Sequence, residues 1–414
     1  MHIVFVSREY HNSKRGGGIA TYLHDLISMI LDHGHQVTLI TASDDTRTNS
    51  IEVEGNFTKI NLEGGDFIIP QVEPGMITMK KFRIFFRFFS YRLKVLREVL
   101  KLKNVDVLEV SEFGAESVFF KNFDFPVVYR LQTSSLLDRN NGGVFKFRPK
   151  LIPNFFTGYF EKRVLSSADY LTSCSYSLKD WTSKYFNIPA DKINVLYNPI
   201  NLKKWQFRRT EESLASYKIL FVGTVSYEKG VGELVEACKI LKNKGIDLTL
   251  TIAGKLGGYG KNLQQELKDE KWCEFLGHIT KKELNTIYES HSIAVFPSHW
   301  EALGLVTLEA MFSGALVIGS AEGGMSELID DQETGFLIQP KDAVTLSHLI
   351  EKVLNLPLQE KSRISNNAVQ QVIESFSDKK IVPQFISYYQ QVVDDFHASS
   401  NAKSSSDSSL KRGK

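Results

Sequence analysis

The chain has 414 residues, of which 42% are apolar and 24% charged, enough for two ordinary hydrophobic cores and therefore for two domains. Fifty basic residues against forty-eight acidic ones leave a formal net charge of +2, which excludes a nucleic-acid binder that works by overall attraction. Cys174, Cys238 and Cys273 are far apart and form no Cys-x-x-Cys pair, which argues against a disulfide framework or a cysteine metal site and favours a reducing compartment.

The chain opens with a β-branched run at residues 3–7, and a second run follows at 36–41, with a helical pattern at 19–33 between them. This alternation is typical of a parallel sheet with helical crossovers. The opening lacks the cationic lead, long apolar core and cleavage site of a signal peptide. No stretch reaches the roughly 20 apolar residues that spanning a bilayer requires. We therefore expect a cytoplasmic protein, either free or held peripherally on the inner membrane face.

Glycines stand between the first strand and the helix, in Arg15-Gly16-Gly17-Gly18-Ile19. Because glycine has no side chain, Gly17 and Gly18 would let a ligand approach the backbone closely. The alternative is a flexible surface loop. The pattern superficially resembles a dinucleotide fingerprint, but its glycines begin nine residues after Ser7 and no third glycine occupies the expected place.

Residues 80–103 form a basic amphipathic helix, with nine basic residues and only Glu98 against them. One interpretation is a surface helix whose apolar stripe packs on the first domain. Another is attachment to an anionic membrane face, with a lipid-linked acceptor, and the two are compatible. The expected core-facing stripe is Phe82, Phe85, Phe86, Phe89, Leu93, Leu96 and Leu100, and the residues partly off it are Ile84, Phe88 and Tyr91.

The first half of the chain continues the alternating pattern and then breaks. The break falls around Asn198-Pro199, and a polar, charged stretch runs on to Ser216. We therefore predict a first domain over 1–200 and a hinge over 201–216. The further strands of this domain are predicted at 105–110, 127–131, 170–173 and 194–197.

Two polar residues stand at the end of the strand predicted at 127–131. Gln132 can donate and accept hydrogen bonds but cannot exchange a proton near neutrality. Arg130 either contacts a phosphate or supports the strand, and we favour support.

A second α/β series begins after the hinge, and we assign it to a second domain over 217–378. Two doubly wound α/β domains are expected to face each other across a ligand cleft. The strands of this series are predicted at 218–222, 247–253, 273–276, 291–297 and 315–319, and its helices at 231–244 and 263–269.

The first turn of the second domain carries a candidate anion site. Gly223 ends the strand, Thr224 follows, and Lys229 is expected to open the next helix, where its ammonium could serve as a point charge for a diphosphate. The alternative is a lysine at a helix start that is simply exposed to water.

The most informative stretch is Glu301-Ala302-Leu303-Gly304-Leu305-Val306-Thr307-Leu308-Glu309, between two predicted strands. We expect the loop to end near Gly304 and a helix to begin near Leu305 with unpaired backbone amides, a start that attracts phosphate. Glu301 lies in the loop and Glu309 about one turn inside the helix, where their carboxylates suit paired sugar or ribose hydroxyls. The alternative is a pair of solvated carboxylates on a helix face.

Two glutamates eight positions apart resemble the Glu-x7-Glu signature of retaining glycosyltransferases of family 4. A short motif is only a hypothesis until its context agrees, and here the resemblance covers nearly the whole chain. It extends over Gly17-Gly18-Ile19-Ala20, Tyr197-Asn198-Pro199-Ile200, Phe221-Val222-Gly223 with Lys229-Gly230, Glu301 with Glu309, and Glu322-Gly323-Gly324 with Glu327.

The resemblance implies the GT-B fold, with two Rossmann-like domains facing a central cleft and the nucleotide-sugar donor held by the second. It implies that Glu309 grips the ribose, that Glu301 grips the donor sugar, and that Lys229 and helix amides stabilise the departing diphosphate. The implied catalytic residues are Glu301, Lys229 and Gln132, and the implied donor-binding residues are Gly17, Gly18, Gly223, Thr224, Lys229, Glu301, Gly304, Leu305, Val306 and Glu309.

The chain departs from the family pattern at two positions. Thr224 stands where family members usually carry an arginine, which removes one cationic donor. Gln132 stands where the family often places a histidine, which puts an acid–base role at this position in doubt. These departures leave two rival functions open, a GT-B sugar-nucleotide epimerase and a nucleotide-sugar-binding protein without transferase activity. A nicotinamide oxidoreductase rests on the glycine loop alone.

The C-terminal part is expected to hold a helix over 379–397 that crosses back to the first domain, and a disordered serine-rich tail over 398–414. The histidines show no metal-ligand spacing, so we expect no metal and no cofactor besides the donor. The expected partners are a nucleotide-sugar donor, a carbohydrate or lipid-linked acceptor and an anionic membrane surface at residues 80–103, with no nucleic acid.

Overall fold

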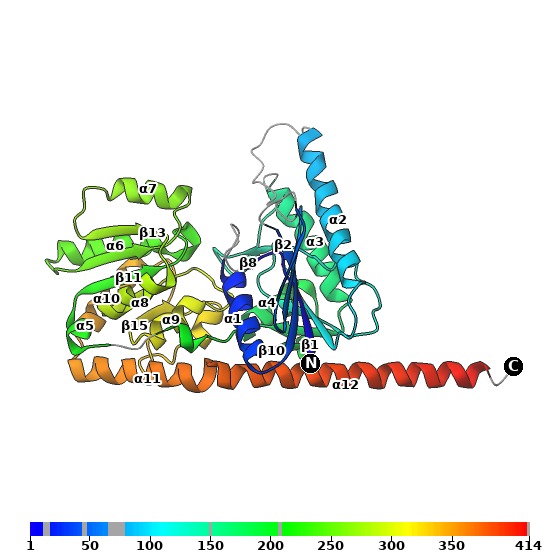
Figure 1. Cartoon of the computed structure of the whole chain (residues 1–414). Helices are drawn as coiled ribbons and strands as arrows, with labels where there is room; N and C mark the ends of the chain where they lie inside the picture. Colours follow the sequence, from blue (N-terminus) through cyan, green and yellow to red (C-terminus); the bar gives the residue numbers. More distant parts are fainter. Residues whose placement is uncertain (11–16, 44–47, 65–78, 149–150, 206–208, 412–414) are drawn as a thin grey trace.

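The computed structural model of the chain describes residues 1–10, 17–43, 48–64, 79–148, 151–205 and 209–411, the side chains of 79–85, 281 and 401–411 excepted. Two α/β domains lie side by side over two consecutive C-terminal helices, residues 358–376 under the second domain and residues 378–411 under the first (Figure 1). The strands of the first domain are β1 (His2–Val6), β2 (Gln36–Ala42), β3 (Ser50–Glu54), β4 (Phe57–Leu62), β5 (Val107–Ser111), β6 (Val127–Leu131), β7 (Leu137–Asp138), β8 (Gly143–Val144), β9 (Tyr170–Ser173) and β10 (Ile193–Val195).

Within the described residues, the first sheet has eight strands in the order β10-β9-β6-β5-β1-β2-β4-β3. Its neighbours pair in parallel except for β3, which forms an antiparallel edge with β4. Strands β7 and β8 form a separate small hairpin. The helices of this domain are α1 (Gly18–Asp32), α2 (Met79–Val99), α3 (Ile152–Ser166), α4 (Tyr176–Phe186) and the 3-10 turn η2 (Ala190–Lys192).

Strand β1 shows why this sheet is covered on both faces. Ile3 and Phe5 pack into a core with α1, whereas Val4 and Val6 pack into a core with α2 on the opposite face. Successive side chains of a strand point to opposite faces, so a continuous apolar run fits a sheet with helices on both sides.

The second domain repeats the architecture with a smaller sheet. Within the described residues it has six strands in the order β13-β12-β11-β14-β15-β16, and all neighbours are parallel. These strands are β11 (Lys218–Val222), β12 (Thr249–Ala253), β13 (Cys273–Gly277), β14 (Ile293–Phe296), β15 (Leu316–Ser320) and β16 (Phe336–Ile338). The helices are η4 (Tyr227–Lys229), α6 (Val231–Asn243), α7 (Gly258–Glu266), α8 (Lys281–Ser290), α9 (Leu305–Phe312), η5 (Gly324–Glu327), α10 (Ala343–Leu354) and α11 (Leu358–Phe376).

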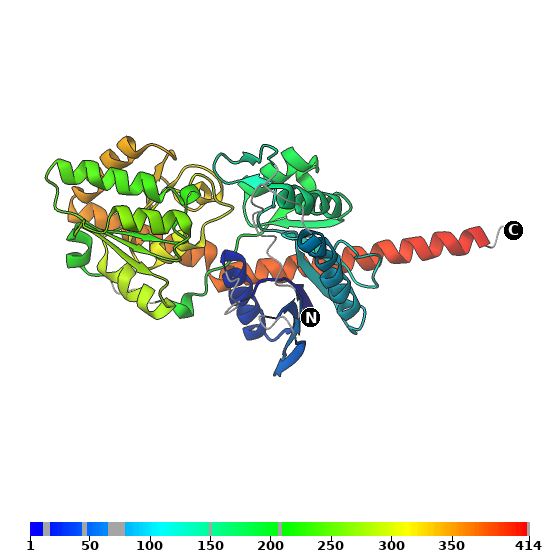
Figure 2. The ribbon, with the colours of Figure 1, turned by 90° about the horizontal axis from the view of Figure 1, so that it is seen from above.

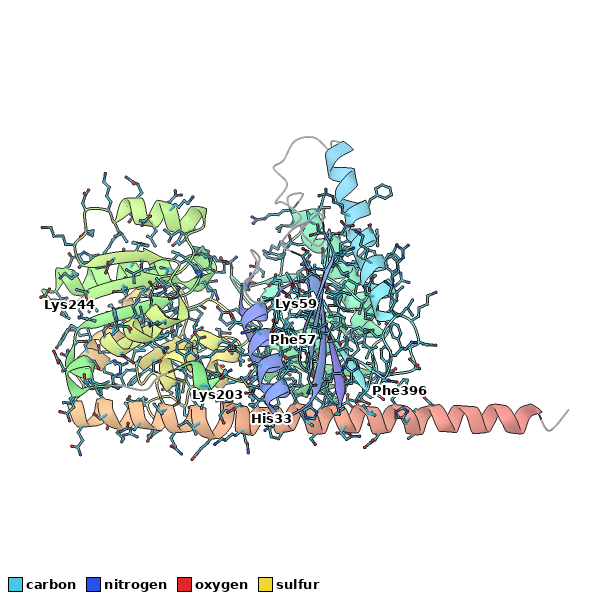
Figure 3. All side chains as sticks on the ribbon, in the orientation of Figure 1. His33, Phe57, Lys59, Lys203, Lys244 and Phe396 are labelled. Atoms are coloured by element: carbon cyan, nitrogen blue, oxygen red, sulfur yellow. The ribbon has the colours of Figure 1, made fainter. Side chains whose placement is uncertain are left out.

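The segment between the domains, with η3 (Leu202–Lys204) and α5 (Glu211–Ala215), is anchored to both of them. Lys203 pairs with Asp32 at the end of α1 at 2.7 Å, and Figure 3 shows Lys203 between the domains, near that end of the helix. Further along, the Arg209 guanidinium donates to the Gly314 carbonyl of the second domain at 2.9 Å. One end of the linker is therefore bonded to the first domain and the other end to the second.

The C-terminal helix α12 (Asp378–Lys411) runs under the first domain and beyond it (Figure 2). The Tyr389 hydroxyl donates to the buried Glu109 carboxylate of β5 at 2.8 Å, which attaches the helix to the first domain. The helix continues to Lys411, so residues 398–411, expected to be disordered, are helical in the structure, while residues 412–414 lie outside its described part. The reason is that no glycine or proline interrupts residues 384–411, and alanine, serine and lysine can extend an existing helix.

The structure confirms the α/β fold with two doubly wound domains, but part of the predicted core-facing stripe of helix α2 is wrong, although Phe89 packs against the core as expected. Phe88 and Tyr91, expected partly off the core stripe, are 1% exposed, while Phe86 is 68% and Leu100 64% exposed. Periodicity was wrong here because apolar residues occur on every side of α2. Phe82, Phe85 and Ile84 lie outside the described side chains.

In the part of the chain that the structure describes, no helix combines the length and apolar character needed to cross a bilayer.

Candidate active site

The loops that follow the parallel strands of the second sheet converge on the side that meets the first domain. The loop after β14 runs from Pro297 through Glu301 to Gly304, and the turn after β15 contains Gly323. The Gly324 amide donates to the Glu301 carbonyl at 2.8 Å. A Cβ at Gly323 would stand 2.3 Å from the same carbonyl oxygen, so only glycine allows this approach. The backbone of Glu301 is therefore fixed by the next loop.

The Glu301 side chain is held by a cation and a hydroxyl. Lys229 forms an ion pair with its Oε1, and the Ser298 hydroxyl donates to the same oxygen at 3.1 Å. The side chains of Lys229 and Glu301 are 23% and 13% exposed. Burial by itself would raise the pKa of Glu301, but the charge and hydrogen bond of Lys229, followed by Arg139 and Ser298, hold that pKa below its ordinary value. Glu301 is therefore an ionised carboxylate at neutral pH.

Lys229 reaches Glu301 from a position slightly different from the one expected. It ends the 3-10 turn η4 rather than opening the next helix, and α6 begins at Val231 after Gly230, which has a left-handed backbone. The alternative of a lysine simply exposed to water does not hold, because its ammonium contacts a buried carboxylate.

Helix α9 begins at Leu305, as the sequence predicts, and its start lacks a side-chain cap. Gly304 precedes it with φ 92°, and the Thr307 amide already donates to the Gly304 carbonyl at 2.9 Å. Among the described residues, nothing accepts from the amides of Leu305 and Val306. Two adjacent backbone amides at the positive end of a helix form a site for an anion.

Glu309 lies on the second turn of α9 and is only 8% exposed. Together with the ion-paired Glu301, this placement contradicts the alternative of two solvated carboxylates on a helix face. The other residues of the second-domain prediction lie at the first turn of its sheet: Gly223 has φ 145° and donates its amide to the Ala253 carbonyl at 2.9 Å, and Thr224 is exposed.

The residues predicted in the first domain lie at the corresponding edge of its sheet. Gly17 caps the start of α1 without a side chain, and Gly18 is the first helical residue. Residues 11–16, including Arg15 and Gly16, are outside the described part of the chain. Gln132 is 6% exposed, and its backbone N–H donates to Glu112 Oε2 at 2.7 Å.

Glu112 is a buried carboxyl group that the sequence did not single out. It lies directly after β5 and is 2% exposed. Desolvation, and next to it the charge of Glu161, raise the pKa of Glu112 to about 8. Nothing in the residue pattern around 112 distinguishes it from an exposed glutamate, because its burial depends on the loops after β5 and β6 packing together.

Arg139 and Trp300 are two further residues that sequence reasoning missed. The turn between β7 and β8 lies against Trp300, the residue before Glu301; a Cβ at Gly142 would stand 2.7 Å from Cδ1 of its indole. Arg139 in this turn is exposed and close enough for its charge to lower the pKa of Glu301. The first domain therefore adds a positive charge to the site, from a position that no motif marks.

Comparison with known proteins agrees with this geometry. The model of Glycosyltransferase Family 4 matches residues 16–204, and the model of Glycosyl transferases group 1 matches residues 203–371. The chain is a glycosyltransferase of family 4. An uncharacterized glycosyltransferase of Methanocaldococcus jannaschii is 26% identical over 406 residues, which cover 94% of this chain and 98% of that protein.

Solved structures show the same GT-B fold. A sucrose-phosphate synthase from Thermosynechococcus elongatus superimposes with a TM-score of 0.75 at 20% identity, covering 94% of this chain and 98% of that one. Anabaena HepE in complex with UDP and glucose gives a TM-score of 0.67 at 17% identity, covering 94% and 99%. The family models and the relative named above show that this family 4 enzyme is a glycosyltransferase that uses a sugar nucleotide, and none of the proteins named above favours an epimerase, a binding protein or an oxidoreductase.

Proposed function

We propose that this family 4 glycosyltransferase transfers its sugar with retention of the anomeric configuration, to an acceptor used in surface polysaccharide or glycolipid synthesis. The observation that carries the proposal is the Lys229–Glu301 ion pair beside the uncapped start of α9. The segment after β14 supplies a carboxylate for sugar hydroxyls and two free amides for a diphosphate, and the turn after the neighbouring strand β11 supplies a cation. Relatives named for capsular polysaccharide biosynthesis in Staphylococcus aureus and for amylovoran biosynthesis in Erwinia amylovora support the choice of acceptor.

In this proposal the main work of the site is to stabilise the negative charge that develops on the departing diphosphate. The amides of Leu305 and Val306 and the ammonium of Lys229 are fixed before the reaction, so they need no reorganisation during it. Glu301 accepts hydrogen bonds from donor sugar hydroxyls, and Glu309 from the ribose diol. Gly223 and Thr224 line the donor site from the first turn of the sheet.

The site offers no separate nucleophile in the proposed arrangement. A front-face displacement, in which the leaving phosphate takes the proton of the acceptor hydroxyl, needs only the groups described. Gln132 is then a hydrogen-bonding residue on the acceptor side, and Gly17 and Gly18 bring the backbone of α1 to the donor phosphates from the first domain. We propose that transfer needs no metal; among the described residues, no group of three or more possible ligands is gathered.

The acceptor side carries a surface suited to an anionic membrane. The outward stripe of α2 exposes Phe86 and Leu93 beside Arg87 and Arg97, while Leu100 follows the end of the helix. Apolar side chains that enter the interface next to cations that meet lipid headgroups are the combination by which amphipathic helices bind such membranes. A lipid-linked acceptor and peripheral attachment to the inner membrane face would follow from this surface.

The test of the proposed function begins with a thermal-shift screen of UDP-, ADP- and GDP-sugars. A nucleotide sugar at about a hundred times its dissociation constant should add roughly 2.7 kcal/mol of stability. The sugar that binds is then supplied with lipid-linked and free carbohydrate acceptors, and NMR of the product assigns the anomer. An inverted product, a donor isomerised without acceptor, or the loss of transfer in EDTA would each overturn the corresponding part of the proposal.

A further inference from the structure

Glu327, at the end of η5 in the second domain, accepts four hydrogen bonds from the first domain. The backbone amides of Tyr176 and Ser177 donate to it at 2.9 and 2.7 Å. The Ser177 hydroxyl donates at 2.7 Å and the Tyr197 hydroxyl at 3.0 Å. A single carboxylate therefore binds two separate segments of the opposite domain.

The position of Glu327 at the start of α4 makes these bonds strong. Ser175 caps this helix by accepting from the Leu178 amide at 3.1 Å, which leaves the first two amides for another acceptor. Glu327 supplies that acceptor, and its charge lies at the positive end of the helix. Hydrogen bonds to an ionised group are shorter and stronger than neutral ones. Burial, and next to it the charge of Glu327, raise the pKa of Tyr197, so this hydroxyl remains a donor.

The turn that leads to Glu327 also contacts the loop that carries Glu301. Glu301 and Gly323 form a parallel bridge, and the Gly324 amide donates to the Glu301 carbonyl. Glu327 lies three residues further along this turn and takes its bonds from the other domain. The short segment from Gly323 to Glu327 therefore contacts both the backbone of Glu301 and the start of α4.

We propose that Glu327 is a positioning residue: by binding the start of α4, it holds the Gly323–Gly324 turn, and with it Glu301, in the orientation that transfer requires when the domains are together. This inference rests on the proposed role of Glu301. A residue that only packed the domains together would not change the dynamics of the Glu301 loop.

Hydrogen exchange measured by mass spectrometry directly tests the contact between Glu327 and the start of α4. The variants are Glu327→Ala, Glu327→Gln and, from the opposite domain, Ser177→Ala. The matched control is Glu333→Ala, which removes a glutamate of the same domain that pairs with Arg363 at 2.5 Å on the surface.

In Glu327→Ala, exchange of the amides at 176 and 177 should accelerate about tenfold or more, the cost of losing a charged acceptor. The Gly324 amide should accelerate with them. Glu327→Gln keeps one carbonyl oxygen and should give intermediate rates, while Glu333→Ala should match the wild type. Faster exchange at 176 and 177 with an unchanged Gly324 amide would overturn the proposal.

Kinetics on the same variants separate positioning from folding. With the nucleotide sugar found in the screen, kcat of Glu327→Ala should fall about tenfold or more while the Kd for UDP, or for whichever nucleotide binds, changes less than about twofold. Glu327→Gln should recover part of kcat. An unchanged kcat would overturn the inference, and if Glu327→Ala does not fold, Ser177→Ala carries the same test. Failure of the wild type to bind any nucleotide sugar would instead reject the proposed function. The hydrogen-exchange result does not depend on nucleotide binding, so it would still test the contact of Glu327.

Discussion

Arg130 donates a hydrogen bond to Asn198 Oδ1 at 2.7 Å, which ties strand β6 to the beginning of the linker between the domains. The same guanidinium donates to the Leu196 carbonyl at 2.6 Å and lies over the rings of Tyr22 and Phe385, 5.2 and 5.1 Å from their centroids. Arg130 is 1% exposed. It supports the strand, as favoured from the sequence, and its cation is committed inside the first domain rather than offered to a phosphate.

Replacing Arg130 should therefore cost stability rather than ligand affinity. Arg130→Met removes buried hydrogen bonds to Leu196 and Asn198 and the positive charge that lowers the pKa of buried Glu109, so it should lower the free energy of unfolding by roughly 3–5 kcal/mol. Urea unfolding measures the loss, with the exposed Arg163→Met as control. A variant that folds with wild-type stability but fails to bind nucleotide would contradict this role.

Removing Lys229 should lower turnover far more than stability. Loss of one charge-stabilising donor lowers turnover by roughly 10²- to 10³-fold. Lys229→Ala is compared in a transfer assay with Lys239→Ala, a lysine whose ion pair with Glu266 at 2.9 Å lies on the surface of the same domain. An unchanged transfer rate in Lys229→Ala would refute the assignment.

Replacing the two glutamates of the signature should have different effects on nucleotide affinity and on the rate of sugar transfer. Glu309→Gln weakens acceptance of the ribose hydroxyls and should reduce nucleotide affinity, by about tenfold for a charged hydrogen bond. Glu301→Gln should leave the affinity for the bare nucleoside diphosphate within about twofold and reduce transfer by about a hundredfold. Calorimetry with UDP and a transfer assay measure the two effects. The opposite pattern would exchange the two roles.

Glu112 makes stability depend on pH. Its folded pKa, about 8, lies above the ordinary value of 4.5, so its contribution is fully present below pH 4.5 and is lost as the pH rises to about 8. Glu112→Gln can still accept the hydrogen bond from the backbone N–H of Gln132, and it removes this loss of stability. The difference in unfolding free energy between the variant and the wild type should grow by at most about 1.4 kcal/mol per pH unit between these limits.

Denaturation at several pH values checks the slope for Glu112, with Glu211→Gln, an exposed glutamate of α5, as the control. A flat difference between pH 4.5 and 8 would show that Glu112 ionises normally in the folded protein.

The exposed stripe of α2 should bind anionic vesicles. Replacing Phe86 and Leu93 by serine removes the apolar contact, and Arg87→Glu with Arg97→Glu reverses the charge beside it. Each pair should abolish cosedimentation with phosphatidylglycerol vesicles, since a cation near an anionic surface contributes about 1 kcal/mol. The control pair Lys242→Glu and Lys244→Glu lies on the second domain, at the end of α6. Retention of both α2 variants on the vesicles would remove the argument for a membrane acceptor.

The sequence was sufficient to predict those strands and helix starts that depend on neighbouring residues. Strands at 127–131, 170–173 and 218–222 match the structure residue for residue, because each is a short run whose side chains are mostly buried in the sheet. The start of α9 at Leu305 also follows from local signals. The edge pair β3 and β4 was missed; β3 is exposed along its whole length and lacks an apolar face that would mark it.

Contacts between distant segments could not be predicted. The buried face of α2 is decided by Arg92, whose guanidinium donates to the Gly114 and Ala115 carbonyls, a partner loop that periodicity within the helix cannot reveal. Arg139 reaches the surroundings of Glu301 only because a hairpin of one domain packs on Trp300 of the other. Glu327 was marked by resemblance, yet its partners are 130 to 151 positions away in the chain.

The polypeptide passes between the domains at two places, and these passages are bonded to each other. The Ile200 amide donates to the Phe376 carbonyl at 3.0 Å, and Ile200 forms a parallel bridge with Ser377. The two passages are therefore connected to each other at a single point. A substitution in either passage is therefore expected to change how the two domains move relative to each other.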